Sequence, residues 1–144
     1  MGATHLEVHM AAPNPDIPLL AALPSKDRAQ ILSYLKQRSF EPGQIVVREG
    51  DQALNLFIVI SGRARVERDG VVTAPNIGPG DFFGELALIE EHGRTATVVA
   101  EEHLSCYIVP AWEFRALLKE YPQMAVPLLF ALIARIHASE HVPD

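Results

Sequence analysis

A carboxylate that directly follows a glycine, and a guanidinium nine residues later, stand out chemically in this sequence. They are Glu85, after Gly84, and Arg94. Residues Gly84 to Ile89 favour a helix of about one to two turns, and the free N–H groups at the start of such a helix attract anions. Gly84 would let a ligand approach the backbone closely. Because the planar guanidinium of Arg94 can bind two phosphate oxygens, the segment predicts a phosphate site.

The carboxylate of Glu85 needs a partner of its own, because it would repel a neighbouring phosphate. A ribose 2′-hydroxyl can donate a hydrogen bond to it. A ligand with a free 2′-hydroxyl, a phosphate held close to the sugar and a base that needs apolar surface has the outline of a 3′,5′-cyclic nucleotide. The alternative is that Glu85 and Arg94 pair with each other, or that the pocket has degenerated into scaffold.

The composition fits one folded domain. The chain has 144 residues, of which 49% are hydrophobic, and 12 basic against 18 acidic residues give a net charge of -6. It therefore lacks the basic surface of a nucleic-acid binder, and we expect no nucleic-acid partner. Cys106 is the only cysteine, which excludes an intramolecular disulfide and suits a reducing compartment. No apolar run is long enough to cross a bilayer, so we expect a cytoplasmic protein without membrane insertion.

The first part of the chain is expected to be a lead-in to the main fold. Residues 1–10 can be a leader or cloning segment, since they end in a histidine and a second methionine. Residues 11–39 are interpreted as a helical N-terminal segment. Within it, Ser25 is predicted to cap a helix that runs from Lys26 to about Gln37.

Residues 40–109 change to short β-branched or apolar runs separated by turn signals rich in glycine and proline. This rhythm is typical of a small antiparallel sandwich or barrel. Residues 55–60 are predicted to form a buried strand. Residues 64–68 alternate and lead into Asp69-Gly70, a hairpin-turn dipeptide.

Residues 110–144 return to helical periodicity, which predicts two closing helices. One face of the first carries Phe114, Leu117, Leu118 and Tyr121. The second, residues 124–136, is apolar on almost every face and is therefore predicted to be buried on more than one side. Pro127 lies too far from Pro122 for the first turn of a helix that starts there, so it should kink or restart the helix and could mark a hinge.

The stretch Phe83 to Val98 resembles the phosphate-binding cassette of the cyclic nucleotide-binding domain family. Several turns are also similar to those of the family, and in the same order: Phe40-Glu41-Pro42-Gly43, Glu49-Gly50-Asp51, Ile60-Ser61-Gly62, Pro79-Gly80-Asp81 and Tyr121-Pro122. The resemblance covers roughly residues 17 to 139. It implies a mainly β fold with flanking helices, an antiparallel β-roll or jelly-roll sandwich with a helical lead-in, a short cassette helix and two C-terminal helices.

The resemblance also implies roles for individual residues. Glu85 would bind the ribose hydroxyl, Arg94 the cyclic phosphate, and helix N–H groups would add to the phosphate. Thr95 matches a position where a hydroxyl contacts the phosphate or the purine, but it does not decide between cAMP and cGMP. We expect cAMP as the ligand, with cGMP as the alternative. Arg135 matches a position from which a lid arginine reaches the purine; otherwise it extends into water. The implied binding residues are Gly84, Glu85, Leu86, Ala87, Arg94, Thr95 and Arg135.

The implied function is a sensor or regulatory domain that binds a cyclic nucleotide and transmits a movement of the lid helix to an effector, with no enzymatic activity and no cofactor. Two alternatives are a ligand-free β-roll interaction domain and a cupin-like metal enzyme. The enzyme would need clustered histidines, whereas residues 40–110 contain only His92 and His103, and no metal site is expected. The chain ends soon after the last helix, so it is either a stand-alone sensor or an excised module of a channel, kinase or transporter.

Overall fold

The computed structural model describes residues 17–51, 54–84 and 96–140, and it describes their side chains except for residues 74–76 and 135–140. The strands are β1 (Lys36–Phe40), β2 (Ile45–Val47), β3 (Asn55–Ser61), β4 (Ala64–Arg68), β5 (Val71–Ile77), β6 (Phe82–Phe83), β7 (Thr97–Ala100) and β8 (Leu104–Pro110). The helices are the 3₁₀ turns η1 (Pro18–Leu20) and η3 (Pro122–Met124) and the α-helices α2 (Ser25–Tyr34), α3 (Ala111–Glu120) and α4 (Ala125–Glu140).

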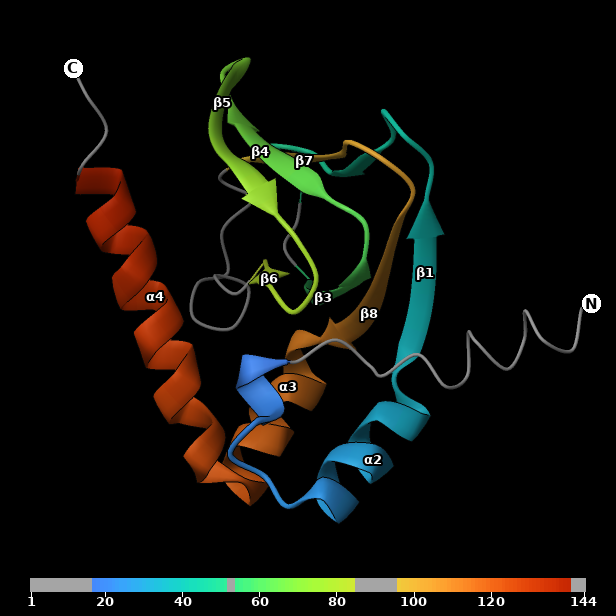
Figure 1. The fold of residues 1–144 in the computed structure, drawn as a ribbon, viewed down its shortest axis with the longest axis vertical. Coiled ribbons are helices and arrows are strands. Elements are labelled where there is room, and N and C mark those ends of the chain that lie inside the picture. The colour runs from blue at the N-terminus through green and yellow to red at the C-terminus, as the bar shows by residue number, and fades with distance from the viewer. Residues whose placement is uncertain (1–16, 52–53, 85–95, 141–144) are drawn as a thin grey trace, which may run out of the picture.

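The described strands form two four-stranded sheets (Figure 1). One sheet has the order β1-β8-β3-β6 and the other β2-β7-β4-β5, and the paired strands are antiparallel. This confirms the antiparallel β-roll with a helical lead-in and two closing helices. The short cassette helix that the sequence predicts falls in residues 85–95, outside the described residues.

Strand β3 contributes side chains to two separate cores, because successive side chains of a strand point to opposite faces. Leu56 and Ile58 belong to a helix-side cluster, whereas Phe57 and Val59 belong to an inner cluster that joins both sheets. The inner cluster consists of Phe40, Phe57, Val59, Ala64, Phe83, Val98, Ala100, Leu104 and Cys106. The predicted buried strand at residues 55–60 is therefore confirmed, and its four central residues are all buried.

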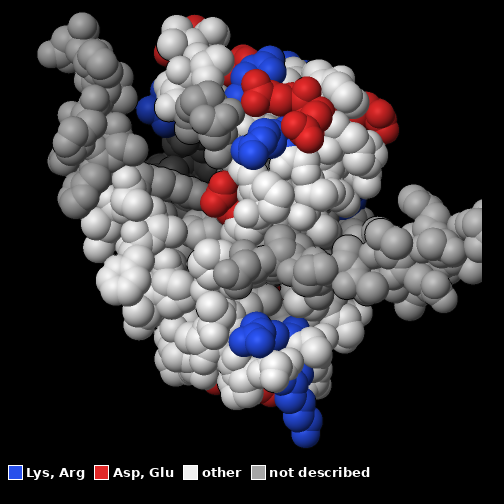
Figure 2. Space-filling model, in the orientation of Figure 1, with Lys and Arg blue, Asp and Glu red and all other residues white. Residues whose placement is uncertain are grey.

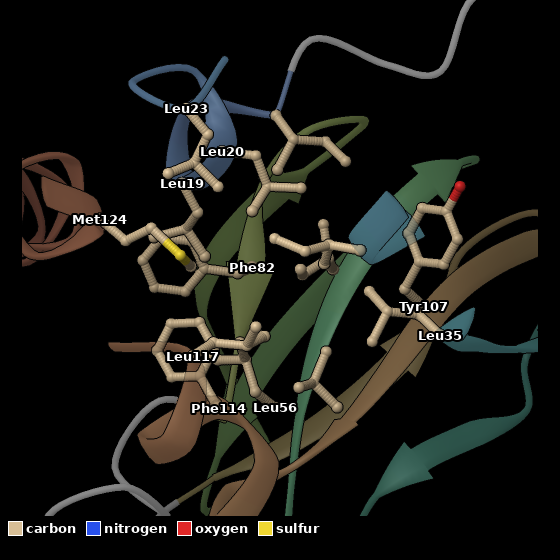
Figure 3. Close-up of a cluster of buried hydrophobic side chains, with 14 residues drawn as sticks. Leu19, Leu20, Leu23, Leu35, Leu56, Phe82, Tyr107, Phe114, Leu117 and Met124 are labelled. Atoms are coloured by element: carbon tan, nitrogen blue, oxygen red, sulfur yellow. The ribbon is translucent and has the colours of Figure 1, made fainter. Parts of the chain in front are cut away.

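The helix-side cluster fastens the helices to the outer face of the first sheet. Figure 3 shows Leu56, Phe82 and Tyr107 of the sheet together with Phe114 and Met124 of the C-terminal elements. Leu19 and Leu20 of η1, and Leu23 and Leu35 on either side of α2, belong to the same cluster. Burying side chains of this size stabilises the fold by about 1.5 to 3 kcal/mol each, so the helices and the roll form one packed unit.

The hairpin turn between β4 and β5 has the predicted residues. Asp69 and Gly70 have φ values of 54° and 79°, the left-handed region that a two-residue hairpin turn requires. Arg68 pairs with Val71 directly across this turn. The hairpin predicted from Asp69-Gly70 is confirmed.

Both predicted boundaries of the N-terminal helix are wrong. Ser25 is the first helical residue rather than the cap, which is Pro24, and no side-chain hydrogen bond caps the helix. At the other end, Leu35 is already extended, and Lys36 begins a strand that pairs with β8. The pairing of β1 with β8 overrides the local helical preference of this segment.

The chain bends sharply between the two C-terminal helices. The axis of α3 and that of Pro122–Ala134 differ by 113°. Because α4 begins at Ala125, Pro127 lies in its first turn, where its missing N–H costs no hydrogen bond. The prediction that the helix restarts is confirmed.

Among the described helices none alone is long and apolar enough to cross a membrane. Taken together, α3 and the segment Pro122–Ala134 have the length and composition of a membrane span, but the two parts are bent by 113°.

The expectation that the last helix is buried on more than one side is wrong. Leu128 and Ala131 pack against the helix-side cluster, but the opposite face is open to solvent. This α4 apolar face consists of Val126, Leu129, Phe130 and Ile133, which are 46 to 68% exposed. In Figure 1, α4 runs along the side of the molecule, and nothing in the described part of the chain covers this face. This exposed apolar face is a candidate interaction surface.

Candidate ligand-binding site

The structure describes the two ends of the predicted cassette but not its middle. Gly84 is described, and Arg135 lies on α4 without a described side chain. The remaining predicted binding residues, Glu85, Leu86, Ala87, Arg94 and Thr95, lie outside the described residues. Their roles therefore stay predictions, and the geometry on either side of them limits where they can lie.

The N-terminal end of the cassette leaves the core at β6. The ring of Phe83 stacks on that of Phe57, with centroids 4.9 Å apart and an angle of 7° between the planes, and both rings are buried. The next residue, Gly84, has a φ of 88°, a conformation that strains any residue with a side chain. Gly84 is the last described residue before Glu85, so the cassette leaves the inner cluster through this glycine.

The turn before β6 is held rigidly against β3. The N–H of Gly78 donates to Asp81 Oδ2 at 2.8 Å, and the N–H of Val59 donates to the Asp81 carbonyl at 2.8 Å. The N–H of Gly80 donates in turn to the Val59 carbonyl at 2.9 Å. A side chain at Gly78 would meet the Arg63 guanidinium at 3.1 Å. These contacts fix the direction in which the chain enters Phe83 and Gly84.

The C-terminal end of the cassette returns to the same core at β7. Val98 is buried in the inner cluster that also contains Phe83. It pairs with Val66 of β4, and Thr97 pairs with Glu67. Three residues of extended chain span at most about 11 Å, which bounds the distance between the Cα atoms of Arg94 and Thr97. Glu85 and Arg94 are thus tethered on short lengths of chain to one buried cluster.

Two hydrogen bonds of Glu49 tie three segments together beside this end of the cassette. The backbone N–H of Glu49 donates to Thr97 Oγ1 at 2.9 Å, across 48 positions in sequence. The Glu49 carboxylate accepts a bond from the N–H of Asp69 at 3.3 Å. Sequence reasoning identified Glu49-Gly50-Asp51 only as a turn and missed Thr97, because no periodic pattern marks a bond between such distant residues.

Charged groups elsewhere on the described roll are solvated and partly paired. Arg65 Nε lies 2.6 Å from Glu67 Oε2, and its Nη1 lies 3.8 Å from Glu101 Oε2. Figure 2 shows acidic and basic side chains intermingled over the roll, with largely uncharged atoms over the described part of α4. Among the described side chains no charged one is buried, and no three His, Cys, Asp or Glu residues gather as metal ligands.

Cys106 is fully buried in β8, and burial raises the pKa of its thiol from 9.0 to about 12. Because only the thiolate is reactive, we expect iodoacetamide at pH 8 to label the native protein far more slowly than the urea-unfolded protein. The unfolded thiol ionises near pH 9 and the native thiol only near pH 12, so its contribution to stability is complete below pH 9 and is lost as pH rises towards 12. Mass spectrometry of timed samples measures the labelling; comparable native and unfolded rates would contradict the burial.

The model of the family described as "Cyclic nucleotide-binding domain" matches residues 37–121. A similar curated protein is the cAMP-dependent protein kinase regulatory subunit of Eremothecium gossypii, which is 36% identical over 102 residues, or 71% of this chain and 22% of that protein. The chain spans about a fifth of the length of the curated relatives that it matches first.

Solved structures show the same architecture. The catabolite activator protein of Thermus thermophilus has a TM-score of 0.75 and 29% identity, and the match covers 85% of this chain and 60% of that one. The cAMP-bound structure of PfPKA-R (141–441) has a TM-score of 0.74 and 27% identity, covering 85% of this chain and 42% of that one. Both matches cover far more of the chain than the cassette alone.

Proposed function

We propose, because the chain belongs to the cyclic nucleotide-binding domain family, that it binds a 3′,5′-cyclic nucleotide and acts as a regulatory module. The observation that carries the proposal is the family match across residues 37–121, which includes the whole predicted cassette. The ligand we propose is cAMP rather than cGMP, because the matched kinase subunits are named for cAMP and PfPKA-R was solved with cAMP bound. A regulatory role without catalysis and a cytoplasmic location stay predictions.

In the proposed complex, Arg94 binds two oxygens of the cyclic phosphate and Glu85 accepts a hydrogen bond from the ribose 2′-hydroxyl. The backbone N–H groups from Gly84 to Ala87 supply further donors, and Thr95 contacts the phosphate or the purine. Gly84 supports this arrangement, because its φ of 88° favours glycine, and a glycine leaves the backbone without a side chain where a phosphate would approach. Arg135 is proposed to reach the purine from α4.

We propose that α4 transmits binding to an effector. It joins the rest of the fold through the short turn η3, after a 113° bend, and its apolar face is exposed. A ligand that contacts α4 in only one of two positions would shift the population of positions by its differential affinity for them. The α4 apolar face would then be covered in one state and offered to a partner in the other.

The test of the proposed function is calorimetric titration of the chain, freed of co-purified nucleotide, with cAMP and cGMP in parallel. We expect micromolar or tighter binding of cAMP and weaker binding of cGMP. The absence of heat and of a thermal shift with both ligands would overturn the proposal and favour a ligand-free interaction domain that uses the α4 apolar face.

The role of Glu85 predicts a specific interaction with the 2′-hydroxyl. Glu85→Gln should weaken cAMP binding by about 1 kcal/mol, because the amide oxygen can still accept the bond but a hydrogen bond to a neutral group is weaker than one to a charged group by about that amount. With 2′-deoxy-cAMP the wild type and the variant should bind almost equally, because the donor is then missing. Glu102→Gln makes the same charge change at an exposed position and should bind both ligands as the wild type does. A large difference that persists with the deoxy ligand would assign Glu85 another role.

A further inference from the structure

We propose that Thr97 and Glu49 are positioning residues, which hold the start of β7 so that Arg94 reaches the phosphate in the correct orientation. The inference rests on the proposed function, since it concerns how the same site achieves its affinity. It is carried by the hydrogen bond from the Glu49 N–H to Thr97 Oγ1 and by the bond from the Asp69 N–H to the Glu49 carboxylate.

Thr97 stands at the boundary between the sheet and the cassette. It is the first residue of β7, and its pairing with Glu67 is the last described pair of the β4–β7 ladder in the direction of Arg94. Strand ends fray unless further bonds hold them. The side-chain bond to Glu49 supplies such a hold at the point where the backbone ladder stops.

Glu49 itself is held from the other side. It lies just after β2, whose register with β7 shifts between Ile45 and Val47, so the ladder alone fixes this turn poorly. Its carboxylate reaches the hairpin turn at Asp69, whose φ of 54° makes that turn conformationally restricted. Three segments that are distant in sequence therefore meet at Glu49, and each restricts the other two.

The benefit for binding comes from preorganisation. Two parallel hydrogen bonds from a guanidinium to a phosphate require both partners in one plane at short range, so small displacements of the arginine weaken both bonds. Only Thr95 and Ala96 separate Arg94 from Thr97. A fixed strand start therefore reduces the backbone freedom that Arg94 must lose when the ligand binds.

The deciding variant is Thr97→Val, which keeps the shape of the side chain but removes the acceptor for the Glu49 N–H. We expect cAMP affinity to fall about 3- to 10-fold, in keeping with the loss of one neutral hydrogen bond, and Thr97→Ser to restore most of it. Thr73→Val is the matched control, because Thr73 is an exposed strand residue in the same sheet whose hydroxyl donates a long hydrogen bond, 3.4 Å, to the Val66 carbonyl, away from Glu49 and Thr97. It should leave the affinity unchanged.

Thr97→Val is also made in the Arg94→Lys and Glu85→Gln variants, to distinguish an effect on the position of Arg94 from a general loosening of the fold. In Arg94→Lys, which keeps the charge but loses the planar fork, Thr97→Val should cost less than 2-fold, because there is no longer a fork to orient. In Glu85→Gln it should keep its full effect, since the ribose contact is separate. Equal effects in all backgrounds, or unchanged affinity in the wild-type background, would overturn the inference.

Two further measurements cover the remaining outcomes. Circular dichroism melts establish whether Thr97→Val is folded; if it is not, Glu49→Ala takes its place in the same backgrounds with the same expected pattern. This variant removes the carboxylate that accepts the Asp69 N–H bond and, with it, one negative charge. If the wild-type protein binds no cyclic nucleotide, the proposed function fails and this inference fails with it. Wild-type binding with no dependence on Thr97 or Glu49 overturns the inference alone.

Discussion

Arg94→Ala is expected to weaken cAMP binding by about 2 to 5 kcal/mol, which corresponds to roughly 30-fold to several thousand-fold in Kd. The size of the effect follows from what the truncation leaves behind. A cyclic phosphate held against a site without its guanidinium would have lost water without gaining a charged partner, and an unpaired charge is costly to desolvate. The net charge of -6 makes this worse, because the rest of the protein repels an anion.

Titration calorimetry of the variant against cAMP measures this loss directly. Lys119→Ala is the matched control, since it removes one positive charge from an exposed position on α3 and should change Kd less than 2-fold. A loss below tenfold for Arg94→Ala would show that the phosphate is bound mainly by backbone N–H groups. The cassette would then be an anion site built from a helix start alone.

Those features of the fold that depend on local patterns could be predicted from the sequence. The buried strand β3 follows from its continuous apolar run, and the β4–β5 hairpin follows from Asp69-Gly70, where both residues adopt a positive φ. The face of α3 that carries Phe114 and Leu117 follows from helical spacing. In each case the physical cause acts within about ten residues of chain.

Features that depend on distant partners could not be predicted in this way. The end of α2 at Tyr34 is set by the pairing of Lys36 with Ile108, which no local signal reveals. The bond between Glu49 and Thr97 joins residues 48 positions apart.

The exposure of α4 shows a different limit. An apolar helix indicates that apolar surface must be covered, but the sequence does not say whether the cover comes from the same fold. In α4, Leu128 and Ala131 are covered by the helix-side cluster, whereas Leu129 and Phe130 are exposed to solvent.

Phe83→Ala is the second large effect that we expect, this time on stability. Phe83 is 4% exposed and stacks on Phe57, so its truncation removes both buried area and an aromatic contact. Replacing a buried phenylalanine by alanine typically lowers the free energy of unfolding by about 3 to 5 kcal/mol. Because domains of this size are stable by only about 5 to 15 kcal/mol, a large part of the total would be lost, and urea unfolding followed by circular dichroism would measure it.

The adjacent residue provides a control that separates stability from binding. Phe82 is equally buried, at 3% exposure, but it points into the helix-side cluster, whereas Phe83 belongs to the inner cluster from which both ends of the cassette emerge. Phe82→Ala should therefore lose similar stability. At low temperature, with both variants folded, Phe83→Ala should bind cAMP clearly more weakly than Phe82→Ala. Equal affinities would mean that the inner cluster supports the fold without positioning Glu85 and Arg94.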